Sequence, residues 1–281
     1  MKYAIVVSIF KTEFGPIVFK GNLADNIKLA SNLGYDAVEF AVKNPESVDI
    51  EALKKILEQY NIPALTFGTG QVFFDQGLSF SDKDKNKREN AVKSVKRIID
   101  LAANFNASII IGLIRGKVHS IDGNPENAIK KAEEKVSICL KECMDYSEKY
   151  GTRFFIEPIN RYETNIFNTL SSVSSFFNRF KDIFDLNRIG ILADTFHMNI
   201  EEPVIEKSIQ NHIKMIKHVH FADSNRWAPG YGHTDFERIF KVLKDNNYSG
   251  YISFEILPLP DPVAAARDAL SYIKNLERKI I

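Results

Sequence analysis

The chain has 281 residues, of which 44% are hydrophobic, and its formal net charge is +1. This length and apolar content predict one large core, and the near-neutral charge gives no bias toward nucleic acid or an anionic membrane surface. The start, MKYAIVVSIFK, has too short an apolar run for a signal peptide, and no run approaches the ~20 apolar residues of a membrane span. The two cysteines, Cys139 and Cys143, give no disulfide framework, so we expect a cytoplasmic protein.

Apolar runs that are typical of strands alternate with periodic runs that are typical of helices along the whole chain. The expected strands cover residues 3–9, 36–41, 63–68, 108–114, 153–157, 189–194, 216–222 and 251–256. The expected helices cover residues 23–33, 49–60, 87–105, 125–150, 169–181, 203–213, 235–246 and 262–278. Eight such repeats without a break in composition predict an α/β protein, with one (β/α)₈ TIM barrel domain over residues 1–281.

Turn residues and loop lengths agree with this division. Asn124 and Pro125 are typical of a helix start, and Gly151 of a helix end. Long loops are expected at 69–86 and 223–234, where they would follow the third and seventh strands. In a barrel of this kind, loops after strands form the mouth that binds substrate.

Four potential metal ligands end four successive expected strands: Glu157, Asp194, His220 and Glu255. In a closed parallel barrel these positions converge on one mouth. Three carboxylates and one imidazole suit a hard or borderline divalent cation better than structural zinc, which prefers Cys and His. We therefore expect one divalent metal ion, with Mn²⁺ as the first choice and Mg²⁺ or Co²⁺ as alternatives.

Each of these residues has a simpler explanation when it is taken alone. Glu157 and Glu255 lie in apolar strands and would otherwise need a structural ion pair, because a buried acid is costly without a partner. Asp194 has the position of a helix cap. His197, three residues later, is a second ligand, a substrate contact or an ordinary buried histidine. The occurrence of all four residues at consecutive strand ends favours a metal site.

Two further expectations concern neighbouring basic residues. His218 and His220 alternate along one strand, and we expect His220 to point inward and His218 to point toward the helices. Arg115 ends the strand 108–114, so its guanidinium is expected at the same mouth, where it would suit a carboxylate or phosphate. An ordinary loop arginine is the alternative. His119 and His212 are expected at the surface.

Several strings of this sequence resemble the D-tagatose 3-epimerase group of the xylose-isomerase-like TIM barrels, which includes many sugar phosphate isomerases and epimerases. They are Glu157-Pro-Ile-Asn-Arg-Tyr-Glu163, Asp194-Thr-Phe-His197, the run from His220 to Arg226, and Glu255. More narrowly, Gly68-Thr-Gly-Gln71, Ile111-Gly-Leu-Ile-Arg115-Gly and Asp223-Ser-Asn-Arg-Trp-Ala-Pro-Gly230 are similar to the 5-keto-L-gluconate epimerase branch.

The resemblance implies roles for residues at matching positions. Glu157, Asp194, His220 and Glu255 fall on the metal ligands of the group, and Glu157 and Glu255 also fall on its acid/base pair. The remaining matches fall on substrate contacts: Glu163, His197 and Arg226. The expected partner is a small sugar or keto-sugar acid, with no nucleic acid or membrane, and homo-oligomers are common in the group.

The expected metal ligands and acid/base pair predict a defined reaction. A divalent cation on a ketone oxygen and the adjacent hydroxyl would stabilise the enediolate formed when the neighbouring carbon loses its proton. Two carboxylates on opposite faces would then remove the proton from one side and return one to the other, inverting the carbon. The expected substrate is a ketose or a keto-sugar acid such as 5-keto-L-gluconate or D-tagaturonate.

Five alternatives use the same fold. Aldose–ketose isomerases and sugar phosphate epimerases share the proton transfer, and an inosose-type dehydratase would expel a hydroxyl instead. An abasic-site endonuclease needs extra histidines after the third and fourth strands, where this chain has Gly68 and Arg115. A non-catalytic sugar-binding barrel is the fifth alternative, although every expected ligand and acid/base residue is present.

Overall fold

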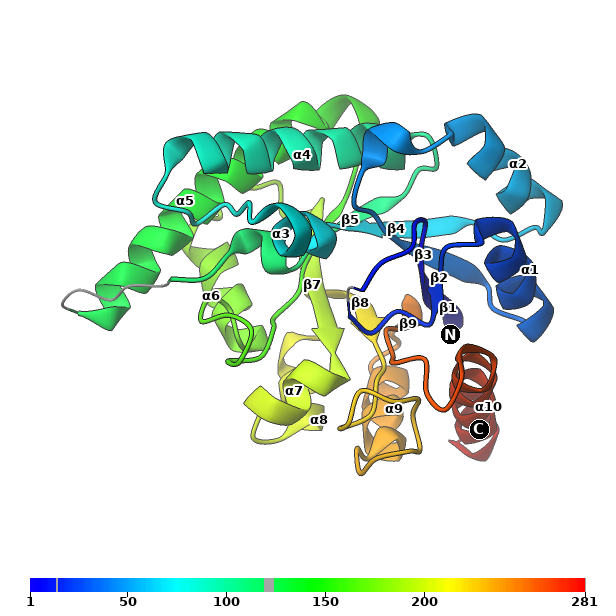
Figure 1. The fold of residues 1–281 in the computed structure, drawn as a ribbon. Coiled ribbons are helices and arrows are strands. Elements are labelled where there is room, and N and C mark those ends of the chain that lie inside the picture. Colours follow the sequence, from blue (N-terminus) through cyan, green and yellow to red (C-terminus); the bar gives the residue numbers. More distant parts are fainter. Residues whose placement is uncertain (14, 119–123, 281) are drawn as a thin grey trace.

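The computed structural model describes residues 1–13, 15–118 and 124–280; His119 lies outside these ranges. Within them, eight parallel strands form a closed barrel, because β1 pairs with both β3 and β9 (Figure 1). The expected single (β/α)₈ barrel is thereby confirmed. The barrel strands are β1 (Lys2–Ser8), β3 (Ala37–Ala41), β4 (Ala64–Gly68), β5 (Ser108–Ile111), β6 (Phe154–Ile156), β7 (Ile189–Asp194), β8 (Ile216–His220) and β9 (Tyr251–Phe254).

One short strand was not expected from the sequence. Strand β2 (Phe19–Lys20) pairs with Val7 and Ser8, beyond the part of β1 that pairs with β9. It extends the sheet on the side where the strands end.

Most of the helices surround the barrel on its outer side, and the short helix Gly70–Gln76 lies across one end of the barrel (Figure 1). They are α1 (Leu23–Leu33), α2 (Ile50–Gln59), α3 (Gly70–Gln76), α4 (Lys85–Ala103), α5 (Pro125–Tyr146), α6 (Leu170–Arg179), α7 (Thr195–Glu201), α8 (Ile205–His212), α9 (Phe236–Asp245) and α10 (Pro262–Ile280). Short 3₁₀ turns cover Pro45–Ser47, Leu113–Arg115 and Glu148–Tyr150. Helix α3 falls in the expected loop 69–86, and α7 directly follows β7. No helix in the described ranges is long and apolar enough to cross a membrane.

Local capping explains where several helices begin and end. The Asn124 side chain accepts a hydrogen bond from the Glu126 amide at 2.8 Å, with Pro125 in the first turn of α5. Gly34 ends α1 in the left-handed region, at φ 90°, where a side chain is disfavoured. His212 is half-buried at the end of α8, and its Nδ1 lies 2.8 Å from the Ser208 carbonyl.

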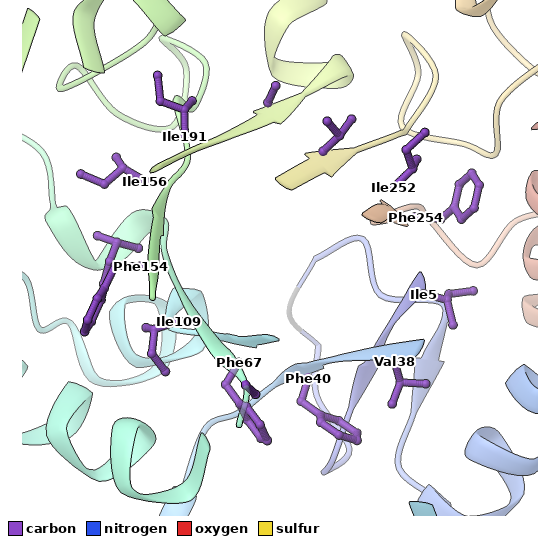
Figure 2. Packing of buried hydrophobic residues seen from close by; sticks show 14 of the residues in the cluster. Ile5, Val38, Phe40, Phe67, Ile109, Phe154, Ile156, Ile191, Ile252 and Phe254 are labelled. Atoms are coloured by element: carbon purple, nitrogen blue, oxygen red, sulfur yellow. The ribbon is translucent and has the colours of Figure 1, made fainter. Parts of the chain in front are cut away.

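The two faces of each strand have different surroundings. The residues that face the helices form the main apolar core, and the labelled side chains in Figure 2 point outward from the barrel strands. They include Ile5, Val38, Phe40, Phe67, Ile109, Phe154, Ile156, Ile191, Ile252 and Phe254. This layer holds the helices against the barrel through burial of apolar surface.

The opposite faces of the strands line the barrel interior, which holds many polar side chains beside a smaller set of apolar ones. Glu39 on β3 is in register with Thr66 on β4, and Thr66 is in register with Ser108 on β5. Across the barrel, His220 on β8 is in register with Asp194 on β7. Buried polar groups of this kind are costly unless they pair with each other or with a ligand.

Candidate active site

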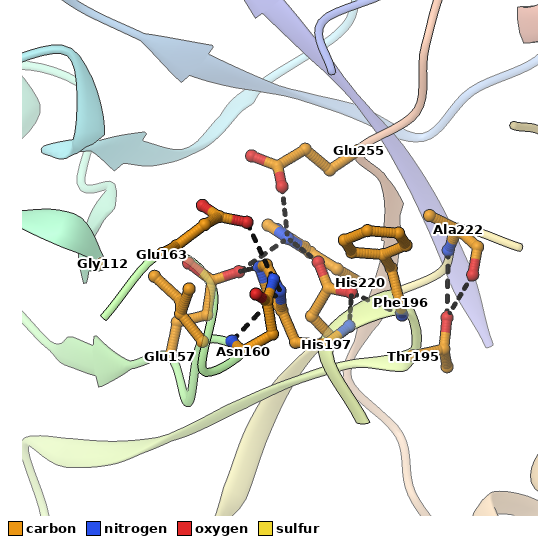
Figure 3. Close-up of polar contacts among 12 residues, drawn as sticks. Gly112, Glu157, Asn160, Glu163, Thr195, Phe196, His197, His220, Ala222 and Glu255 are labelled. Carbon is orange, nitrogen blue, oxygen red and sulfur yellow. Dashed lines mark hydrogen bonds and ion pairs between the residues drawn. The ribbon is translucent and has the colours of Figure 1, made fainter. Parts of the chain in front are cut away.

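The four expected metal ligands meet at the end of the barrel where the strands finish, and Figure 3 labels three of them, Glu157, His220 and Glu255. Asp194 and His220 are the last residues of β7 and β8, whereas Glu157 and Glu255 directly follow β6 and β9. One ligand atom of each lies within 4.8 Å of the others. His220 Nδ1 is 3.6 Å from Asp194 Oδ2, 3.7 Å from Glu157 Oε1 and 3.8 Å from Glu255 Oε2.

These distances fit ligands that share one cation. They exceed the hydrogen-bond range, whereas two ligands that each lie ~2.1 Å from one metal ion are typically ~3 Å or more apart. Glu157 Oε1, Asp194 Oδ2 and His220 Nδ1 are also buried without a hydrogen-bond partner in the described part of the chain. Buried polar atoms without partners are rare, and these three converge on one point, so the donor set fits a divalent ion.

Asp194 uses its two carboxylate oxygens for different purposes. Oδ1 caps helix α7 by accepting hydrogen bonds from the amides of Phe196 at 2.7 Å and His197 at 3.2 Å. Oδ2 remains free of these bonds and faces His220. The cap fixes the carboxylate, so the capping role and the ligand position considered for Asp194 are compatible.

Crowding and burial set the charges of the site. Burial raises the pKa of Glu157 well above its usual range, and the negative charge of Glu255 adds to the rise. Burial also raises the pKa of Glu255, although the Arg226 guanidinium opposes that rise. Burial acts in the same direction on Asp194, but the Arg226 guanidinium and the charges that His197 and His220 carry at low pH outweigh it and hold the pKa of Asp194 below its usual range. A bound cation would balance the three carboxylates.

Arg226 lies over the ligand set on the loop after β8. Its Nη2 is 2.5 Å from Glu255 Oε2, its Nη1 is 3.7 Å from Glu163 Oε1, and its guanidinium stacks on the Phe196 ring at 4.5 Å. The main-chain amide of Arg226 donates to the Asp223 carbonyl at 2.8 Å, which helps to fix the loop. The structure therefore brings Arg226 and Glu163 to the ligand set.

His197 also faces the site, from the first turn of α7. Its Nε2 is 3.7 Å from Glu157 Oε1, and its Nδ1 is 2.8 Å from Asn160 Nδ2. Burial lowers the pKa of His197 to about 3, so the ring is neutral near pH 7. Because the Asn160 amide donates to Nδ1, the hydrogen of the ring is on Nε2, which points toward Glu157. Asn160 was not singled out from the sequence, although it lies between Glu157 and Glu163.

The expected orientation of His218 was wrong. Residues two positions apart on a strand share a face, so His218 points into the barrel together with His220. Both rings contact one carboxylate on the other side of the interior: Glu39 Oε2 is 2.8 Å from His218 Nε2, and Glu39 Oε1 is 2.9 Å from His220 Nε2. Glu39 was missed, although an acid in the apolar string Ala37–Ala41 gives the same signal that identified Glu157 and Glu255.

Arg115 does not lie where the sequence suggested. Its side chain is fully buried and donates to the main-chain carbonyls of Ile166 at 2.9 Å, Gly112 at 2.9 Å and Phe167 at 3.3 Å. It does not line the cavity described below. The 3₁₀ turn Leu113–Arg115 directs the side chain behind the segment that follows β6, where main-chain acceptors replace the expected anionic ligand.

A cavity of about 390 Å³ opens above the ligand set. At its polar end lie Glu39, Glu157, Glu163, His197, His220, Arg226 and Glu255. Its other walls are mainly apolar, and include Phe73, Phe74, Leu113 and Ile159. Trp227 stacks on Tyr231 and is not among the lining residues. The volume and lining are those of a small-molecule site.

Comparison with known proteins identifies the family. Residues 27–276 match the model of the xylose isomerase-like TIM barrel family. The chain belongs to this family. The match covers all of the site residues and confirms the family expected from the sequence.

Individual relatives carry names of sugar epimerases. A 3-dehydro-D-guloside 4-epimerase of Escherichia coli (strain K12) is 27% identical over 92% of this chain and 96% of its own length. A ketose 3-epimerase of Arthrobacter globiformis is 27% identical over 82% of this chain and 76% of its own. The crystal structure of a D-allulose 3-epimerase from Methylomonas sp., in complex with D-allulose, has a TM-score of 0.79 and 24% identity, covering 98% of this chain and 96% of that one. The names of these relatives agree with the isomerase class expected from the sequence.

Proposed function

We propose that the protein is a divalent-metal-dependent epimerase that inverts the carbon next to the carbonyl of a ketose or keto-sugar acid. The observation that carries the proposal is the placement of two carboxylates, Glu157 and Glu255, at one point in the cavity, from strands that are not neighbours (Figure 3). One carboxylate would remove the proton from the substrate carbon, and the other would return a proton to the opposite face. The epimerase names of the relatives support the same reaction.

The residues that would hold the metal are Glu157, Asp194, His220 and Glu255, with Mn²⁺ proposed as the ion. When bound, a divalent cation would polarise the carbonyl and its adjacent hydroxyl, which makes the neighbouring carbon more acidic. Neutral His197 carries its hydrogen on Nε2 and would donate it to a substrate oxygen, while Glu163 and Arg226 would bind the hydroxyls. The apolar walls of the cavity would exclude water from the reacting carbon.

The lining residues bear on the charge of the substrate. Arg226 is the only Lys or Arg among the described residues that line the cavity, and it already pairs with Glu255. Phosphate and carboxylate groups are usually bound by cationic side chains in a fork or cluster. Within the proposal we therefore rank an uncharged ketose ahead of a keto-sugar acid or a sugar phosphate. A cytoplasmic location and a homo-oligomer also remain predictions.

The proposal is tested by incubating the Mn²⁺-loaded protein with ketoses, keto-sugar acids and ketose phosphates and separating the products by chromatography and mass. We expect an epimer of unchanged mass from at least one compound. An aldose would indicate an isomerase, and the loss of one water would indicate a dehydratase. A protein that binds Mn²⁺ but converts none of these compounds would contradict the proposal.

The acid/base assignment has its own test. Glu157→Gln and Glu255→Gln keep the size of each side chain but remove its ability to transfer a proton, so each should lower kcat by ~10²–10⁴-fold. Circular dichroism should show that both variants remain folded. Near-normal turnover in both variants would exclude the two-carboxylate mechanism.

A further inference from the structure

A buried carboxylate connects two histidines beneath the ligand set. Glu39, His218 and His220 expose 3%, 1% and 1% of their surface. Strand β3 is not a neighbour of β8 in the barrel, so the Glu39 side chain reaches across the interior to these rings. Each oxygen of Glu39 contacts one ring: Oε1 lies 2.9 Å from His220 Nε2, and Oε2 lies 2.8 Å from His218 Nε2.

The two nitrogens of His220 face different groups. Nε2 contacts Glu39, and Nδ1 faces Glu157, Asp194 and Glu255. An ionised carboxylate has only acceptors, so a hydrogen bond to Glu39 places a hydrogen on Nε2. In the neutral ring this leaves the lone pair on Nδ1, the nitrogen that points at the other three ligand atoms.

His218 in turn holds Glu39 in place. It occupies the second oxygen of the carboxylate, and its ring stacks on Phe155 with a centroid distance of 5.8 Å and an interplanar angle of 24°. The neighbouring hydroxyl of Thr66, in register with Glu39, has no hydrogen-bond partner in the described part of the chain. The Glu39 carboxylate is therefore directed at the two histidines and does not bond to the Thr66 hydroxyl.

A second metal ion among Glu39, His218 and His220 is the competing explanation, because these three also form a group of potential ligands. Their nitrogen–oxygen distances of 2.8 and 2.9 Å are those of hydrogen bonds. A cation between them would need the hydrogens of both Nε2 atoms to be absent, and His220 would then have to serve two ions at once.

We propose that Glu39 is a positioning residue, which fixes the orientation and tautomer of His220 so that Nδ1 is presented to the metal, with His218 locking the Glu39 carboxylate. Carboxylate–histidine–metal arrangements of this kind raise the basicity of the ligand nitrogen and fix its ring. The inference rests on the metal site of the proposed function.

The test measures Mn²⁺ affinity by electron paramagnetic resonance in Glu39→Ala, Glu39→Gln and a matched control, Thr66→Val. The loss of an outer partner typically weakens metal binding ~10–100-fold, so Glu39→Ala should fall in that range. Glu39→Gln keeps one oxygen acceptor for a histidine and should lose less Mn²⁺ affinity than Glu39→Ala. His218→Leu should show a smaller loss, whereas Thr66→Val changes the same layer and should bind as the wild type does.

A second readout separates positioning from general destabilisation. In Mg²⁺-loaded protein, ¹⁵N NMR should show the hydrogen of His220 on Nε2 in the wild type and in Thr66→Val, and a loss of that single tautomer in Glu39→Ala. If Glu39→Ala does not fold, Glu39→Gln carries the test. Equal Mn²⁺ affinity and an unchanged tautomer in the folded Glu39 variants would overturn the positioning role of Glu39 but not the proposed metal site. A wild-type protein that binds no divalent ion would instead contradict the metal site of the proposed function.

Discussion

At the scale of single residues, Asp194 shows how one side chain can satisfy a structural and a functional requirement together. Its Oδ1 accepts hydrogen bonds from two amides at the start of α7, and its Oδ2 has no hydrogen-bond partner among the described residues and faces His220. The helix thus holds the ligand oxygen in place before any metal binds, which reduces the ordering cost of binding.

The separate roles of the two carboxylate oxygens predict different results for two substitutions of Asp194. Asn is also a good N-cap, so Asp194→Asn should keep the stability of the protein but lose most of its metal affinity. Asp194→Ala should lose the metal affinity and, in addition, ~1 kcal/mol of stability. Urea unfolding of the metal-free proteins and Mn²⁺ titration separate the two effects. Equal stability of both variants would show that the cap contributes nothing.

The residues that sequence reasoning placed well are those at strand ends. The ends of the strands in a parallel barrel meet at one mouth, so the sequence was enough to find Glu157, Asp194, His220 and Glu255. Glu39 and His218 lie deeper in the barrel, and their contact joins residues 179 positions apart, which no local pattern reveals. The direction of the Arg115 side chain depends on a 3₁₀ turn, which the strand pattern did not predict.

At the scale of elements, the turn after β5 supports the site from behind. Gly112 lies next to Glu157, and a Cβ atom at this position would be 3.0 Å from Glu157 Oε2. Such a contact is too close, so the carboxylate would have to move by a few tenths of an ångström.

Gly112→Ala should therefore lower activity without unfolding the protein. Misplacement of a catalytic group by ~1 Å can cost ~10²-fold in rate, so a smaller shift should cost on the order of tenfold in kcat. The measurement compares kcat with the thermal midpoint of the same sample. An unchanged kcat would mean that Glu157 has room to adjust.

The same turn carries Arg115, which connects it to the segment after β6. The guanidinium donates to the carbonyls of Gly112, Ile166 and Phe167, and so holds the segment that begins with Glu157. Burial lowers the pKa of Arg115 to about 10, so the side chain stays charged near pH 7.

Arg115→Met should accordingly act on stability and not on substrate choice. It removes buried hydrogen bonds to main-chain acceptors, and the expected loss in free energy of unfolding is ~2 kcal/mol. KM should change equally for a neutral ketose and for a keto-sugar acid. A rise in KM for the acid alone would restore the substrate role that the sequence suggested for Arg115.

At the scale of the whole molecule, the barrel combines an apolar outer layer with an interior that holds many polar side chains. The outer layer, which includes Phe40, Phe67 and Phe154, holds the helices, while Glu39, Thr66 and Ser108 face inward. Tyr35 on the loop before β3 donates to the Ala266 carbonyl at 2.7 Å, which ties the C-terminal helix α10 to the first repeat. The stable outer layer allows the interior to keep groups that serve the site.

The overall architecture was predictable because eight repeats of one pattern leave few alternatives. The short elements were not: β2 has two residues, and α3 and α7 have seven each, which is too few for a periodic signal. They lie where the strands end, so what the sequence left unresolved is the detail around the cavity.

The proposed reaction depends most on proton transfer at the carbon next to a carbonyl, and deuterium exchange measures this transfer directly. Mn²⁺-loaded protein would be incubated in D₂O with the ketose that it converts best, and after the metal is removed the sugar would be followed by ¹H NMR. Because one carboxylate removes the proton and another returns one from solvent, we predict an epimer with deuterium at the inverted carbon and an unchanged carbon skeleton. An epimer that retains its original hydrogen there would contradict the two-carboxylate mechanism.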